Sequence, residues 1–207
     1  MELDKKNIKK QSTSIVDNRS NSVNPQSFSK ECSDIISFET LISSHLEKRR
    51  KKVVDYFMNS SKDHAAIVMS TIFRESRNHI RIFAEDLAGP ISSNDNYRNE
   101  LLSFILRDGK LDIILQKKSQ EEDSMVHLLL QIKGGKVLNK YSNNININYT
   151  SEKCKLGKFE NVHFCIGDDS MYRIETDTKK FLAQCSLFDS TIAGVLINKF
   201  NNISTNN

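Results

Sequence analysis

Residues 97–115, YRNELLSFILRDGKLDIIL, contain an amphipathic helix followed at once by a strand. Four apolar residues recur at helical spacing, Tyr97, Leu101, Phe104 and Ile105. Asp108-Gly109 then ends the helix, with Gly109 suited to the left-handed conformation beyond a helix end. Residues 111–115 are a short apolar run typical of a buried strand. A helix leading directly into such a strand predicts a crossover unit, in which the helix packs on a sheet of parallel strands.

The same order of elements occurs on both sides of this stretch. Upstream, residues 63–77 have an apolar face at helical spacing and Asp63 as N-cap, and they lead into a β-branched and aromatic strand at 79–84. Downstream, residues 124–133 are helical, Gly134-Gly135 closes the helix, and residues 136–138 follow as a further strand. The alternation predicts a sheet whose first part is parallel.

Beyond Tyr141 the pattern changes. Residues 145–149 alternate Ile and Asn, which fits either an edge strand or a loose loop. Three strands are expected next, at 162–166, 171–175 and 181–187, and the turns between them are short enough for antiparallel hairpins. A last helix begins at a cap formed by Asp189 or Ser190. The predicted fold is therefore α/β, with a mixed sheet of parallel crossover units followed by an antiparallel meander and with helices packed on the sheet.

Composition divides the chain of 207 residues into three parts. Residues 1–35 are too polar to bury the surface that would offset the entropy of ordering them, so a flexible N-terminal arm is expected. Residues 36–62 are predicted to form a basic helix containing Lys48-Arg49-Arg50-Lys51-Lys52, which is more typical of a solvated helix face than of a phosphate-binding patch. Residues 63–203 form the α/β domain, with a single core.

Several classes of protein are disfavoured by the sequence. The apolar runs are too short to cross a bilayer, the N-terminus lacks the apolar segment of a secretory signal, and a cytoplasmic protein is expected. Four cysteines and five histidines show no metal-ligand spacing, and no glycine-rich phosphate loop is present, so neither a metal nor a cofactor is predicted. A net charge of +4 permits nucleic-acid binding without requiring it.

The predicted hairpin at 162–175 is where polar side chains of useful chemistry come together. His163 lies on its first strand, and Arg173 and Glu175 share one face of its second strand, so the three side chains are expected to meet across the ladder. The third strand is expected to bring Ser186 to the same end. Arg74 and Asn78, which close the second helix, are further candidates for ligand binding, although their pattern is more typical of a solvated helix end with a favourable cation.

Residues 65–200 resemble the phospholipase D-like superfamily, and more closely its small degenerate bacterial members. The resemblance is carried by residues 72–89, by residues 97–115, and by the hairpin and final helix, HFCIGDDSMYRIE and AQCSLFDSTIAGVLINKF. Active members carry a His-x-Lys signature with a downstream Asp, in which the histidine attacks phosphorus and the lysine stabilises phosphate charge. His163 matches the histidine, but Cys165 stands at the lysine position and the Asp is out of register. Residues 184–187 also depart from the Gly-Ser-x-Asn that often follows.

Three roles for His163 follow. It can be a half-buried strand histidine bonded to Glu175, part of a binding pocket with Arg173, Glu175 and Ser186, or a surviving nucleophile. The resemblance implies a catalytically degenerate binding or accessory module that recognises a phosphate-bearing ligand or nucleic acid within a bacterial multi-protein system. The alternative is a metal-independent phosphodiesterase or nuclease that uses His163 as nucleophile in a homodimer. In a third possibility the basic helix docks on a protein partner.

Overall fold

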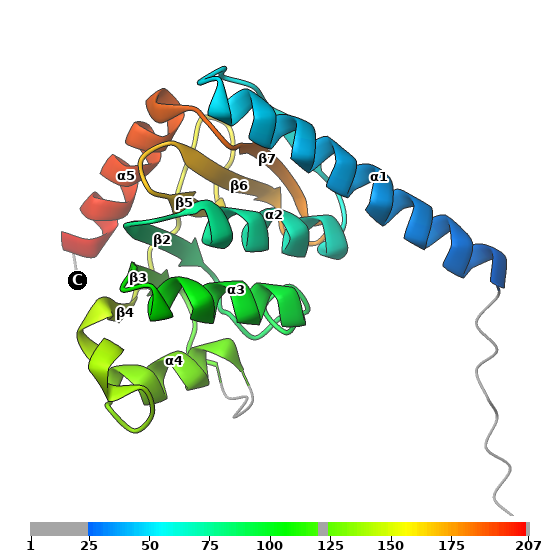
Figure 1. Cartoon of the computed structure of the whole chain (residues 1–207). Helices are drawn as coiled ribbons and strands as arrows, with labels where there is room; N and C mark the ends of the chain where they lie inside the picture. The colour runs from blue at the N-terminus through cyan, green and yellow to red at the C-terminus, as the bar shows by residue number, and fades with distance from the viewer. Residues whose placement is uncertain (1–24, 120–123, 206–207) are drawn as a thin grey trace, which may run out of the picture.

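The computed structural model describes residues 25–119 and 124–205. Its centre is a seven-stranded sheet in the order β1-β7-β6-β5-β2-β3-β4 (Figure 1). The strands are β1 (Phe57–Asn59), β2 (His79–Ala84), β3 (Lys110–Leu115), β4 (Ile145–Tyr149), β5 (His163–Gly167), β6 (Met171–Asp177) and β7 (Leu182–Ser186). The helices are α1 (Pro25–Arg50), α2 (Lys62–Glu75), α3 (Asp95–Leu106), α4 (Met125–Lys133) and α5 (Ser190–Thr205), with a 3₁₀ helix η1 (Asn139–Asn144).

One half of the sheet is parallel, as predicted. β2 pairs with β3 and β3 with β4, and the connections pass through α3 and through α4 with η1. Asn94 caps α3 by accepting hydrogen bonds from two backbone amides of its first turn. At the other end of α3, Asp108 and not Gly109 adopts the left-handed conformation, with φ 62°. Gly109 is nevertheless required, because a Cβ there would overlap the ring of Phe104.

The other half is the predicted antiparallel meander. β5, β6 and β7 pair in succession, β5 also pairs antiparallel with β2, and β1 adds an edge strand beside β7. The turn between β5 and β6 is tied to the start of β2 by the carboxylate of Asp168, which accepts hydrogen bonds from the backbone amides of Arg77, Asn78 and His79. This contact fixes the junction between the two halves of the sheet.

Helices cover both faces of the sheet (Figure 1). The single core expected from the length is wrong, because the sheet separates the buried residues into one core on each face. α1, α2, α3 and α4 lie on one face over the larger core, which includes Phe38, Ile72 and Leu101. α5 lies on the other face over the smaller core, which includes Phe164 and Phe200. None of the helices within the described residues is both long enough and apolar enough to cross a membrane.

Three expectations about local structure need correction. α1 begins at Pro25 and ends at Arg50, so residues 25–35 are helical although an arm to residue 35 was expected, and the predicted basic helix at 36–62 ends early. Residues 57–59 form β1 instead, a strand too short for periodicity to reveal it. Residues 136–138 do not form a strand, because Gly135 turns the chain at φ 70° and the place beside β3 is taken by β4. Residues 1–24 lie outside the described part, and the division into arm, basic helix and domain stays a prediction.

Candidate functional site

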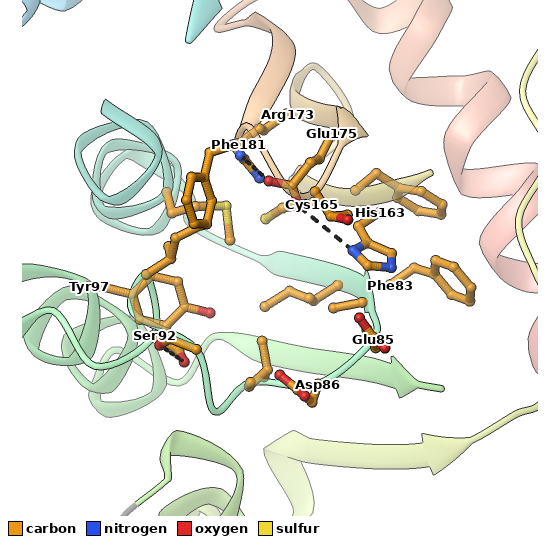
Figure 2. A pocket seen from close by; sticks show the side chains of 18 of the residues that line it. Phe83, Glu85, Asp86, Ser92, Tyr97, His163, Cys165, Arg173, Glu175 and Phe181 are labelled. Atoms are coloured by element: carbon orange, nitrogen blue, oxygen red, sulfur yellow. Dashed lines mark hydrogen bonds and ion pairs between the residues drawn. The ribbon is translucent and has the colours of Figure 1, made fainter. Parts of the chain in front are cut away.

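A cavity of about 230 Å³ opens beside the C-terminal end of β2 (Figure 2). Its walls come from β2 and the loop that follows it, from the facing ends of β5 and β6, from α3, and from the β6–β7 turn. The residues that line it include Glu85, Asp86, Tyr97, His163, Arg173 and Phe181. Ligands of α/β proteins commonly bind beyond the carboxyl ends of the strands, which is where this cavity lies.

His163, Glu175 and Arg173 form a chain of charged and polar groups at one wall of the cavity (Figure 2). His163 and Glu175 are direct cross-strand partners, with 3.6 Å between Nδ1 and Oε2, an ion-pair distance longer than a hydrogen bond. Arg173 donates from Nη2 to Oε1 of Glu175 over 2.8 Å. All three residues are buried, with at most 10% of each side chain exposed. The structure therefore confirms that the hairpin brings these three predicted site residues together.

The second nitrogen of His163 also has a partner. Nε2 lies 3.3 Å from Oε1 of Gln116, the first residue after β3. The amide nitrogen of Gln116 donates to the carbonyl of Glu152 and to the side chain of Asn161, over 2.8 and 3.1 Å. The imidazole is thus oriented from both sides, by a carboxylate and by an amide whose own orientation is set by the long loop after β4.

Asn59 on the edge strand β1 holds Arg173 from its other side. Nε of Arg173 donates to Oδ1 of Asn59 over 3.0 Å, and Nδ2 of Asn59 donates to the carbonyl of Phe181 over 2.6 Å. Neither Asn59 nor Phe181 is among the site residues predicted from the sequence. Neither could be found by pattern, because Asn59 sits on a three-residue strand that reaches the site through pairing with β7.

Electrostatics around Glu175 favour its charged form. Burial alone would raise the pKa of Glu175, but the neighbouring His163 and Arg173 outweigh it and leave the pKa below its usual value. Cys165, at the position of the signature lysine, is buried on the same face, and burial strongly raises the pKa of its thiol. Cys165 is therefore a neutral group and cannot supply positive charge.

The other predicted site residues lie elsewhere. Ser186 pairs with Tyr172, so its side chain is on the α5 face of the sheet, where its hydroxyl accepts a hydrogen bond from the amide of Phe188. Arg74 ends α2, forms ion pairs with Glu75 and Glu100, and borders a separate groove between α1, α2 and α3. Asn78 is exposed just before β2, at the opposite end of that strand from the cavity. The expected pocket of His163, Arg173, Glu175 and Ser186 is therefore complete except for Ser186.

Exposed lysines lie on three loops at the same end of the sheet as the cavity. We call these seven residues the lysine rim: Lys117, Lys118, Lys153, Lys155, Lys158, Lys179 and Lys180. They follow β3, follow β4 and occupy the β6–β7 turn, all at the His163 end of the sheet. Lys118 and Lys158 also lie over the rings of Tyr149 and Phe159, at 5.4 and 5.5 Å from the ring centroids.

The basic run at the end of α1 is largely neutralised within the chain. Lys48 pairs with Asp55, Arg49 with Glu75 and Arg50 with Glu47. Arg49 also donates to the backbone carbonyl of Glu75, which ties α1 to the end of α2. These contacts support the interpretation of the run as a structural and solvated helix end.

Within the described residues, no group of three or more His, Cys, Asp and Glu side chains is arranged to hold a metal ion. Of the described residues lining the cavity, Arg173 is the only Lys or Arg, and Glu175 and Asn59 already occupy it. The site can therefore orient an imidazole and offer hydrogen bonds, but it lacks a cation available to a reacting phosphate.

No protein-family model and no curated protein matches the chain. Among solved structures, NucT from Helicobacter pylori matches with a TM-score of 0.53 and 12% identity, over 73% of this chain and 96% of that one. A phospholipase D family member, Nuc from Salmonella typhimurium, matches with a TM-score of 0.49 and 11% identity, over 73% and 95%. TrmBL2, an archaeal chromatin protein, matches with a TM-score of 0.47 and 13% identity, and this chain covers 65% of its length. At such identities the likeness concerns the fold alone, and the chain shares the fold of NucT.

Proposed function

We propose that the protein is a recognition module for a phosphate-bearing ligand, with nucleic acid favoured, and that it does not hydrolyse what it binds. The observation that carries the proposal is the contrast between the lysine rim and the cavity at the same end of the sheet. Seven exposed lysines lie on these loops, and three of them, Lys117, Lys155 and Lys180, pair with carboxylates. The position two residues after His163 holds a buried neutral thiol. Phosphates can be attracted to the rim, but a pentavalent transition state at His163 would lack the stabilising cation.

Binding through the lysine rim should depend strongly on salt. Each phosphate neutralised by a lysine releases counterions, so the logarithm of the affinity should fall linearly with the logarithm of the salt concentration. Lys118→Gln with Lys158→Gln should weaken binding to a single-stranded oligonucleotide and make the salt slope shallower. Lys51→Gln with Lys52→Gln removes the same charge from the exposed end of the basic run and is the matched control. No binding at low salt, or equal losses in both double variants, would contradict the proposal.

Hydrolysis is the second candidate function, and one observation favours it. Glu175 orients His163 in the way that a carboxylate orients a catalytic histidine. A metal-independent activity would cleave a generic phosphodiester, such as bis(4-nitrophenyl) phosphate, in the presence of a chelator. We expect no turnover by the wild-type protein. Turnover by the wild type that disappears in His163→Ala would overturn the proposal and favour the phosphodiesterase alternative. Size-exclusion chromatography would then show whether the active form is a homodimer.

A further inference from the structure

Tyr97 of α3 presents a buried hydroxyl to the cavity without using it. The side chain is 1% exposed, and its hydroxyl has no hydrogen-bond partner among the described residues. Figure 2 shows this hydroxyl directed into the space between α3 and the His163 wall. A buried polar group without a partner is unfavourable, and such groups are uncommon unless something outside the chain satisfies them. Burial also strongly raises the pKa of Tyr97, so the hydroxyl stays protonated and remains a donor.

The walls next to Tyr97 are apolar and in part aromatic. They include Ile82, Leu87 and Phe181. Phe181 adopts a left-handed backbone conformation, φ 53°, that is unusual for a bulky residue. Asn59 holds it there through the bond to its carbonyl. Strained residues of this kind concentrate at ligand sites, so the strain is a second observation that points to the cavity.

The charges that line the cavity are mainly negative, in contrast to the rim. Glu85, Asp86 and Glu175 line the cavity together with a single guanidinium, that of Arg173, which Glu175 already binds. An anion inside would therefore meet more carboxylates than cations. The volume of about 230 Å³ is below the roughly 300–1,000 Å³ of pockets that hold drug-sized ligands. The occupant is therefore small, largely apolar and without negative charge.

We infer that the cavity binds an uncharged planar ring bearing a hydrogen-bond acceptor, and that Tyr97 recognises this acceptor by donating from its hydroxyl. The ring can belong to a free small molecule or to an unpaired nucleic-acid base. In the second case, which rests on the proposed function, the phosphates beside the base contact the lysine rim while the base occupies the apolar cavity. Stacking of unpaired bases on aromatic side chains beside a positively charged surface is a common mode of single-strand binding.

The preference for an uncharged ring with an acceptor is tested with three probes that each contain a benzene ring: benzamide, toluene and benzoate. Each probe is titrated into the protein and binding is followed by NMR. Benzamide has an acceptor and no charge, toluene lacks the acceptor, and benzoate is an anion. We expect benzamide to bind more tightly than the other two. Tyr97→Phe removes the donor without changing shape, and it should weaken benzamide binding about five-fold while leaving toluene binding unchanged, as expected for one hydrogen bond.

Tyr141→Phe is the matched control, because the Tyr141 hydroxyl bonds to the carbonyl of Leu106 outside the cavity. It should leave all three affinities unchanged. Thermal melts of each variant show that it is folded. Absence of benzamide binding, benzoate binding as tight as benzamide binding, or the same benzamide affinity in Tyr97→Phe as in the wild type would each overturn the inference.

The source of the ring is tested with a single-stranded oligonucleotide and its duplex. If an unpaired base enters the cavity, the wild type should prefer the single strand, and Tyr97→Phe should reduce that preference. A second outcome is that the single strand and the duplex bind with equal affinity, in the wild type and in Tyr97→Phe alike, while benzamide binding still depends on Tyr97. In that case no nucleic-acid base enters the cavity, and its ligand is a free small molecule. Failure to bind either nucleic acid at low salt overturns the proposed function and not the ring chemistry.

Discussion

His163, Glu175 and Arg173 are the residues on which both the stability and the chemistry of the site depend. Glu175 bonds to Arg173 and lies against His163, and all three are buried. Removing one member of a buried ion pair leaves the other charged and uncompensated, which typically costs about 3–5 kcal/mol. The arrangement explains why the hairpin can keep a guanidinium in a core that also contains Cys165 and Cys185.

Glu175→Ala should therefore lower the free energy of unfolding by about 3–5 kcal/mol, because it leaves Arg173 without its carboxylate. Urea unfolding measures this change. Glu160→Ala is the control, since Glu160 is 82% exposed and its pair with Lys155 is on the surface, where such pairs contribute about 0–1 kcal/mol. Similar losses of unfolding free energy in the two variants would show that the buried pair contributes no more to stability than the surface pair.

The pH dependence of stability should follow from the same carboxylate. The pKa of Glu175 is lowered in the folded protein, so below its usual value of 4.5 the unfolded chain binds more protons than the folded one. The stabilising contribution is therefore fully present above pH 4.5 and is lost as the pH falls through the folded-state pKa. Between pH 5 and pH 3, the free energy of unfolding should fall less in Glu175→Gln than in the wild type. Urea titrations at pH values spaced about one unit apart measure this difference. A steeper decrease would contradict this assignment.

Tyr97 should behave in the opposite way from Glu175. Its hydroxyl is buried without a partner among the described residues, so the hydroxyl contributes an unfavourable desolvation term. Tyr97→Phe should raise the free energy of unfolding of the unliganded protein by about 1 kcal/mol, whereas most substitutions of buried residues lower it. Denaturant unfolding provides the measurement, and a loss of stability would show that the hydroxyl has a partner in solution.

At the scale of elements, the junction between the parallel and antiparallel halves of the sheet is the least ordinary feature. β2 belongs to both halves, since it pairs parallel with β3 and antiparallel with β5. Asp168, in the turn that follows β5, accepts three backbone hydrogen bonds from the segment that enters β2. Its backbone is left-handed, φ 48°, which Asp tolerates better than most residues. One side chain thus positions two elements that are far apart in sequence.

Asp168→Ala should lower the unfolding free energy by about 2–3 kcal/mol. Three backbone amides, one of them partly buried, lose a charged acceptor, and Ala is less tolerant of the left-handed backbone. Asp169→Ala is a matched control one residue away, since Asp169 is 83% exposed and its nearest cation, Arg81, is 3.7 Å distant. Thermal or urea unfolding of both variants measures the difference. An equal loss of unfolding free energy in the two variants would mean that the hydrogen bonds of Asp168 do not stabilise the fold.

For the whole molecule, α1 is the element that extends beyond the sheet (Figure 1). Its second half is part of the core, with Phe38 and Ile42 buried and the ring of Phe38 stacked on His64 of α2 at 3.8 Å. Ile36, only two residues earlier, is 62% exposed. The boundary between core and extension along this helix therefore lies near residue 37.

Removal of residues 1–35 should leave the domain folded, with a melting temperature lowered by only a few degrees. Within the described part of this segment, the ion pair lost is the one between Asp34 and His64. Removal of residues 1–52 should be much more damaging, since it strips Phe38 and Ile42 from the larger core. Differential scanning calorimetry gives the melting temperatures of the two truncated chains. A large drop for the shorter truncation would contradict the prediction.

The sequence alone determined the types and order of most elements, because helical and strand periodicity and turn residues are local properties of the chain. The mixed sheet and the meeting of His163, Arg173 and Glu175 followed from the short turn between β5 and β6, which fixes their register. Only the tertiary structure decided that Ser186 faces the opposite side of the sheet, that Asn59 reaches Arg173 and that Tyr97 opens onto a cavity. The reason is physical: strand β1, helix α3 and the loops around the cavity approach one another only when the sheet is assembled, and no spacing along the chain records such contacts.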